Sequence, residues 1–86
     1  LSVRGVSIER GFTKQDMQET QVKKRMIEAA DQVVVLADHS KIGKVALSPI
    51  GPLSIADTLV TDTVTDPEFI RRCRDKGIEV IIGSPI

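Results

Sequence analysis

The feature that most constrains the fold of this 86-residue chain is an uninterrupted apolar run at residues 33–37. It consists of three consecutive valines followed by Leu and Ala, and β-branched side chains favour extended backbone. A strand without polar residues is typical of a parallel sheet, in which both faces are covered. Residues 58–61 and 79–82 have a similar character. The sequence therefore predicts three strands of a parallel sheet.

A helix is predicted between the last two of these runs. Asp66 suits its N-cap, Pro67 its first position and Gly77 its end. Its apolar residues are spaced three and four apart, as on the buried face of a helix. We interpret Cys73 as a buried thiol rather than a nucleophile, and both Phe12 and Phe69 as core residues. The predicted buried face consists of Phe69, Ile70 and Cys73.

A second helix is predicted at residues 14–30, with Thr13 as its N-cap and Asp16 three residues later. Apolar residues at helical spacing define its buried face, and charged residues define its solvent face. The buried face would hold Val22, Met26, Ala29 and Ala30, and the solvent face Lys23, Lys24 and Glu28.

The remaining segments complete an α/β pattern. We expect a first strand at residues 1–4, a short extended piece at 45–47 and a loop at 48–52. Strands that alternate with helices imply right-handed crossovers. The predicted fold class is α/β, with a mostly parallel sheet flanked by helices.

The composition argues against several classes of function. Twelve Lys and Arg balance twelve Asp and Glu, whereas a domain that neutralises nucleic-acid phosphates needs an excess of positive charge. A single Cys excludes an intrachain disulfide and a multi-cysteine zinc site, so we expect no metal and no cofactor. The longest apolar run is far too short for a bilayer, and we expect no signal peptide. We expect a cytoplasmic protein with no membrane partner.

The length of the chain indicates that it is part of a larger protein or of an oligomer. Domains most often have about 100–150 residues, and a chain of this size buries only about 60–65% of its unfolded surface. We therefore expect a fragment or a homo-oligomer. Because the first residue is Leu1 rather than Met, we also expect the natural protein to extend upstream.

Polar residues follow the predicted strands, and in parallel sheets ligands bind beyond the carboxyl ends of the strands. Asp38, Ser40 and Lys41 follow the first apolar run. Lysine suits a phosphate, serine offers a hydroxyl donor, and aspartate accepts hydrogen bonds from sugar hydroxyls. In the alternative interpretation the aspartates only cap turns and the lysine is solvated. The other segments expected at this edge are residues 5–7, 62–63 and 83–84.

His39 lies within this candidate site, but sequence spacing reveals no group that would orient it as a general base. A metal site would need further His or Cys ligands, which the chain lacks at suitable spacing. The sequence therefore predicts no chemical role for His39.

Four segments carry a resemblance to a known family. They are residues 5–7, residues 11–13, residues 22–27 with Ala30, and residues 35–43, of which 36–43 are the most specific. Together they resemble the C-terminal effector-sensing domain of the DeoR family of bacterial transcriptional repressors. The resemblance covers essentially the whole chain.

This resemblance implies a Rossmann-like fold shared with ribose-5-phosphate isomerase, glucosamine-6-phosphate deaminase and CoA-transferases. It implies that residues 1–86 are the C-terminal part of a sugar-phosphate sensor. The first half of the sensor and an N-terminal winged helix would lie outside the chain. DNA would be bound only through that winged helix. The predicted effector-binding residues are Gly5, Ser7, Lys23, Asp38, Ser40 and Lys41.

The same resemblance allows an alternative, a fragment of a sugar-phosphate isomerase or deaminase. The position that resembles the isomerase catalytic glutamate is Lys23, and Ser7 lies near an expected aspartate. Proton transfer between sugar carbons needs a carboxylate base, which neither residue supplies. The sequence therefore predicts a sensor in a repressor of sugar-metabolism genes, not an enzyme.

Overall fold

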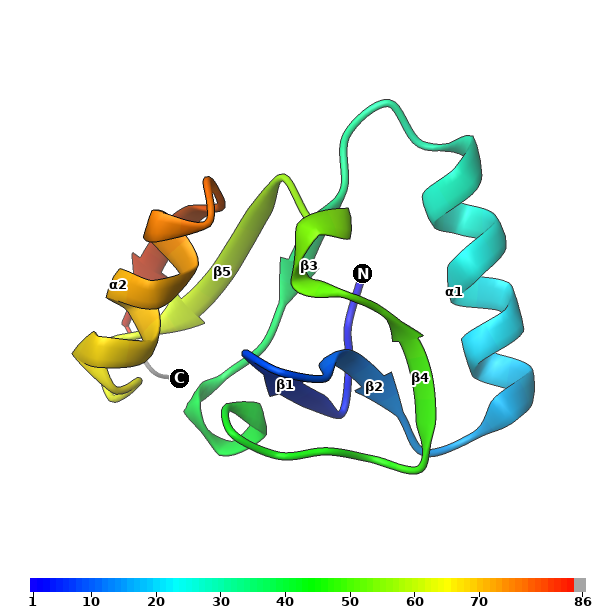
Figure 1. The fold of residues 1–86 in the computed structure, drawn as a ribbon, viewed down its shortest axis with the longest axis horizontal. Coiled ribbons are helices and arrows are strands. Elements are labelled where there is room, and N and C mark those ends of the chain that lie inside the picture. The colour runs from blue at the N-terminus through cyan, green and yellow to red at the C-terminus, as the bar shows by residue number, and fades with distance from the viewer. Residues whose placement is uncertain (85–86) are drawn as a thin grey trace.

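The structure, a computed structural model that describes residues 1–84, places two small sheets between two helices at opposite ends of the molecule (Figure 1). The strands are β1 (Gly5–Ser7), β2 (Gly11–Lys14), β3 (Val34–Leu36), β4 (Ser48–Gly51), β5 (Thr58–Asp62) and β6 (Glu79–Gly83). The helices are α1 (Met17–Ala29) and α2 (Pro67–Asp75), with short 3₁₀ helices η1 (His39–Lys41) and η2 (Leu53–Ile55).

One sheet is parallel, as the apolar runs predict. Its strand order is β3-β5-β6. Val35, Leu59 and Val80 lie side by side in its register, and all three are buried. All three strands run in the same direction, so their carboxyl ends meet at one edge.

The second sheet is antiparallel, and the sequence analysis did not predict it. Its order is β1-β2-β4, so the described residues form an α/β fold, as predicted, but with one parallel and one antiparallel sheet. The strand expected at residues 1–4 is reduced to a parallel bridge between Ser2 and Leu36. The extended segment expected at 45–47 begins instead at Ser48, within the predicted loop. β4 contains Pro49 and lies at the edge of its sheet, where a missing N–H is tolerated.

Helix α2 matches its prediction. Asp66 caps it by accepting a hydrogen bond from the Glu68 N–H at 3.0 Å, and Pro67 is its first residue. Phe69, Ile70 and Cys73 are its buried residues. Burial raises the pKa of the Cys73 thiol, as expected for a structural rather than a reactive cysteine.

Helix α1 differs from its prediction at its start and in its buried face. It begins at Met17 because Asp16, not Thr13, caps it by accepting from the Gln18 N–H at 2.6 Å. Thr13 belongs to β2. The residues of α1 that are buried or half-buried are Thr20, Lys23 and Ile27. The predicted buried residues are instead exposed: Val22, Met26, Ala29 and Ala30.

Both sheets contribute to one core. Phe12 and Val6 from the antiparallel sheet join Val35 and Leu59 from the parallel sheet and Phe69 from α2. The prediction of both phenylalanines as core residues is confirmed.

The parallel sheet also carries an exposed apolar face. Val34, Leu36 and Ile81 alternate with the buried residues of their strands, and these three residues are 37%, 52% and 49% exposed. The outer edge of β3 is occupied, because the Leu36 N–H donates to the Leu1 carbonyl at 2.8 Å. The free edge of this sheet is β6.

The loop at residues 41–46 lies against the antiparallel sheet. The Gly43 N–H donates to the Val6 carbonyl at 2.7 Å, and the Ala46 N–H donates to Thr13 Oγ1 at 2.8 Å. Gly5 is in contact with this loop, since a Cβ at Gly5 would lie 2.6 Å from Thr13 Oγ1 and clash with the carbonyl oxygen of Lys44. Glycine at position 5 therefore allows the 41–46 loop to approach β1.

Gly5→Ala should destabilise the fold by about 1–3 kcal/mol, because the added methyl group overpacks the contact between β1 and the 41–46 loop. Gly83→Ala is the matched control, since a Cβ there meets its nearest atom, the Thr61 carbonyl oxygen, at 3.9 Å. Urea unfolding measures both variants. Equal free energies of unfolding for the two would contradict the close contact at Gly5.

The isolated chain should self-associate through the exposed face of the parallel sheet and the β6 edge. Ile81→Ser should shift the chain toward monomer, whereas Val22→Ser on α1 should not. Sedimentation equilibrium over a range of concentrations checks both variants. A folded wild-type chain that stays monomeric at every concentration would refute this expectation.

Candidate functional site

A pocket of about 380 Å³ lies at the carboxyl ends of β3 and β5. Its floor is apolar and includes Leu36, Ala37 and Val60. The strands bring together polar residues that are far apart in the sequence, as the parallel order predicts. These are Asp38, His39, Ser40, Thr61, Asp62 and Ser84.

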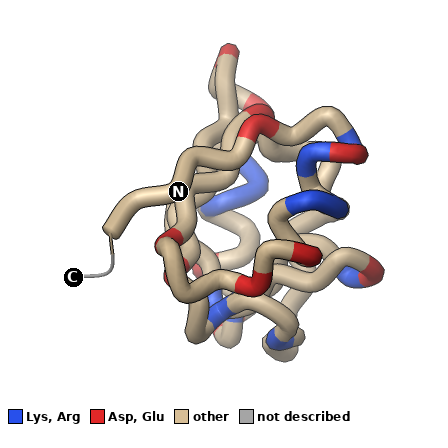
Figure 2. The backbone as a smooth tube through the Cα atoms, turned by 90° about the vertical axis from the view of Figure 1, so that its left-hand side faces the viewer, with Lys and Arg blue, Asp and Glu red and all other residues tan. Residues whose placement is uncertain are grey.

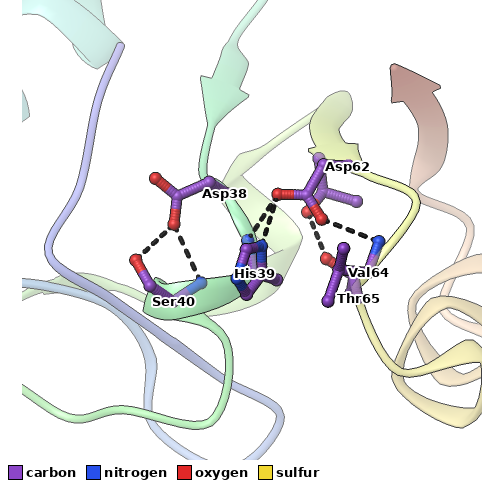
Figure 3. Close-up of polar contacts among 7 residues, drawn as sticks. Asp38, His39, Ser40, Asp62, Val64 and Thr65 are labelled. Atoms are coloured by element: carbon purple, nitrogen blue, oxygen red, sulfur yellow. Dashed lines mark hydrogen bonds and ion pairs between the residues drawn. The ribbon is translucent and has the colours of Figure 1, made fainter. Parts of the chain in front are cut away.

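The carboxylate of Asp62 connects the loops that follow β3 and β5 (Figure 3). Its Oδ2 accepts from the His39 backbone N–H at 3.0 Å and lies 2.8 Å from His39 Nδ1. Its Oδ1 accepts from the Val64 N–H at 2.9 Å. The side chain is 8% exposed, so little water competes for these contacts.

Asp62 is held ionised by this arrangement. Burial alone raises its pKa, but the hydrogen bonds from the His39 backbone, the His39 ring and the Val64 backbone together outweigh burial and lower the pKa to about 2. The negative charge next to His39 therefore persists across the ordinary pH range.

Asp62 also orients the His39 ring, whose side chain is 47% exposed. When the neutral ring donates its Nδ1 proton to Asp62, Nε2 is left as an acceptor. Sequence analysis missed this pair because the two residues are 23 positions apart. The sequence did contain a signal for this pair. His39 and Asp62 each closely follow one of two predicted strands, and those two strands are predicted to be parallel.

Asp38 caps η1 and presents a second carboxylate. Its Oδ1 accepts from the Ser40 N–H at 2.8 Å and from the Ser40 hydroxyl. The Ser40 hydroxyl, followed by the Ser40 backbone, lowers the pKa of Asp38. Both contacts use Oδ1, so Oδ2 can accept hydrogen bonds from a ligand (Figure 3).

Lys41, predicted to act with Asp38 and Ser40, is the last residue of η1 but does not line this pocket. It lines a separate pocket of about 390 Å³. The structure therefore divides the predicted group between two neighbouring pockets that share η1.

Three further predicted residues lie outside both pockets. Gly5 is buried beneath the 41–46 loop. Ser7 stabilises the turn after β1, since its hydroxyl donates to Glu9 Oε2 and accepts from the Arg10 N–H, both at 3.1 Å. Lys23 is half-buried on α1. The structure does not bring these residues together with Asp38.

Within residues 1–84, no group of three His, Cys, Asp or Glu side chains is placed to hold a metal ion. Over the same residues, neither helix has both the length and the apolar character needed to cross a bilayer.

The comparisons with known proteins agree with one another. The family model of the DeoR C-terminal sensor domain matches residues 1–63. The chain is 35% identical over 80 residues to the HTH-type transcriptional regulator IolR of Bacillus subtilis, covering 93% of the chain and 32% of IolR. It is 34% identical over 82 residues to the HTH-type transcriptional repressor GlcR of the same organism, covering 95% and 31%.

The deoxyribose operon repressor of Escherichia coli is 30% identical over 80 residues, which are 93% of the chain and 32% of that repressor. The chain thus spans about a third of the length of the curated relatives it matches.

Asp62→Asn should destabilise the protein at neutral pH and reduce its acid sensitivity. The pKa of Asp62 falls from 3.8 to about 2 on folding, so its stabilising contribution is complete above 3.8 and is lost as the pH falls through about 2. The variant cannot titrate, so its free energy of unfolding should change less between pH 4 and pH 2.

Urea unfolding at stepped pH measures this difference. The exposed Asp31, on the loop after α1, provides a charge-matched control, and Asp31→Asn should not reproduce the loss of stability at neutral pH. Identical pH profiles for wild type and Asp62→Asn would show that the bonds to Asp62 contribute nothing.

Proposed function

The chain belongs to the family of DeoR C-terminal sensor domains, and from this premise we propose that it binds the effector of a transcriptional regulator. The proposed effector is a phosphorylated sugar. Residues 1–86 would be the C-terminal part of the sensor, within a longer protein that binds DNA through a separate winged helix. The regulator would be a cytoplasmic homo-oligomer that represses sugar-metabolism genes.

The observation that carries this proposal is the pocket at the carboxyl ends of β3 and β5. Its carboxylates and hydroxyls can bind a polyhydroxylated ligand, because carboxylate oxygens accept hydrogen bonds from sugar hydroxyls. Its apolar floor, Leu36 and Val60, can contact the carbon-bearing face of a sugar ring. The proposed full fold is the Rossmann-like sheet of the sugar-phosphate isomerases, of which this chain supplies β3, β5 and β6.

The matched family is a sensor domain, and the three relatives described above are named regulators or repressors. This agrees with the sequence prediction of a binding domain rather than an isomerase or deaminase. Lys23 and Ser7, at the positions compared with catalytic carboxylates, also lie outside the pocket.

Asp38→Ala and Lys41→Ala should each weaken effector binding by about tenfold or more, because each removes a charged group from the proposed contacts with the ligand. The effector is first identified by thermal shift of the complete protein against a panel of phosphorylated sugars, since a ligand that binds the native state raises its melting temperature. Isothermal titration then gives the affinities.

The charge-matched controls are Asp31→Ala and Lys24→Ala, both exposed and outside the two pockets. They should bind the effector as wild type does. If both site variants retain wild-type affinity, the assigned site is wrong; if no phosphorylated sugar binds, the proposed effector class is wrong.

A further inference from the structure

We propose that the second pocket, lined by Arg4, Lys41 and Lys44, is the subsite for the anionic group of the ligand, and that Arg4 and Lys44 are binding residues. This inference rests on the proposed function, which it deepens by assigning the two ends of the ligand to different sides of η1. The pocket has a volume of about 390 Å³, enough for a phosphate group and part of the molecule that carries it.

The backbone places the three cationic side chains together. The Arg4 N–H donates to the Thr13 carbonyl at 3.0 Å, which fixes the segment before β1 against β2. Thr13 also holds the 41–46 loop, because its hydroxyl accepts from the Ala46 N–H at 2.8 Å. The Lys44 N–H closes this loop on the Lys41 carbonyl at 3.4 Å. Arg4, Lys41 and Lys44 thus belong to one hydrogen-bonded unit.

The charge of this pocket differs from that of the chain as a whole. Lys and Arg positions lie among Asp and Glu positions over the face seen in Figure 2, and the chain as a whole is neutral. This pocket is lined by three cationic residues together with Gln15, Val45 and Ala46, and by no acidic residue. Within residues 1–84, the ion pairs involve Lys14, His39 and Arg71, so all three cations remain available to a ligand.

The two pockets suit opposite ends of a phosphorylated sugar. The 380 Å³ pocket is lined by the carboxylates of Asp38 and Asp62 and by no Lys or Arg, so it repels a phosphate and favours hydroxyl groups. The 390 Å³ pocket offers the complementary charge. Both are lined by η1 or its cap, with Asp38, His39 and Ser40 on one side and Lys41 on the other. The proposal places the ligand across η1, with its hydroxyl groups in one pocket and its anionic group in the other.

Inorganic phosphate is the probe for this subsite, because it lacks the sugar. We expect isothermal titration of the complete protein to detect phosphate binding that weakens as ionic strength rises. The double variant Arg4→Gln/Lys44→Gln should lower the phosphate affinity at least tenfold. The control Lys24→Gln/Lys76→Gln makes the same change in net charge at exposed positions outside the pocket and should leave the affinity unchanged.

A charge-preserving variant, Arg4→Lys/Lys44→Arg, separates loss of the subsite from loss of the fold. It should retain phosphate binding, and the melting temperatures of all variants without phosphate should match that of wild type. The proposal is overturned if wild type binds no phosphate, or if the neutralising variant and the control bind phosphate equally.

The outcome for the subsite is distinguishable from that for the proposed function. If phosphorylated sugars bind equally to wild type and to Arg4→Gln/Lys44→Gln, the sensor function stands and the subsite is wrong. If inorganic phosphate binds and depends on Arg4 and Lys44 but no phosphorylated sugar binds, the subsite stands and the sugar-phosphate effector is wrong.

Discussion

The parallel pairing of β3 with β5 is the constraint on which the rest of the structure depends. In this register Val35 lies beside Leu59, and both are almost fully buried. A shift of one residue would turn the buried set of β3 toward solvent and expose it. Because the strands run in the same direction, His39, which follows β3, and Asp62, the last residue of β5, meet at one edge. The apolar core thereby determines where the polar site is formed.

Asp62 converts this proximity into a fixed site. One buried carboxylate accepts hydrogen bonds from the backbone after β3, from the His39 ring and from the backbone after β5. These bonds set the position of η1, which in turn separates a pocket with two carboxylates from a pocket with three cations. The antiparallel sheet contributes by holding the 41–46 loop, and with it Lys41, against β1 and β2.

The parts of this fold that local sequence determines were predictable. The apolar runs predicted β3, β5 and β6, and the residues Asp66, Pro67 and Gly77 predicted the limits of α2. The hairpin of β1 and β2 was missed because its strands have only three and four residues and depend on pairing with β4, more than 30 residues further along the chain. That pairing also moved the start of α1, since it incorporates Thr13 into a strand and leaves Asp16 as the cap.

The candidate site was predictable to a similar extent. Asp38 and Ser40 were placed in the pocket from the order of the strands alone, but the His39–Asp62 pair and the separation of Lys41 depend on tertiary contacts. The buried face of α1 was predicted wrongly. Val22 and Met26 have the spacing of buried helix residues, but both are exposed in this chain. An unpartnered helix face and an open sheet face agree with the proposal that the chain is one part of a larger sensor domain.

The central claim is that a ligand binds across η1 at the end of the parallel sheet. Hydrogen–deuterium exchange of the complete protein, with and without the sugar phosphate that most raises its melting temperature, tests this claim most directly. The account predicts slower exchange in peptides that cover residues 38–46 and 62–65, with α1 unchanged. Protection confined to α1, or absent from residues 38–46, would contradict it.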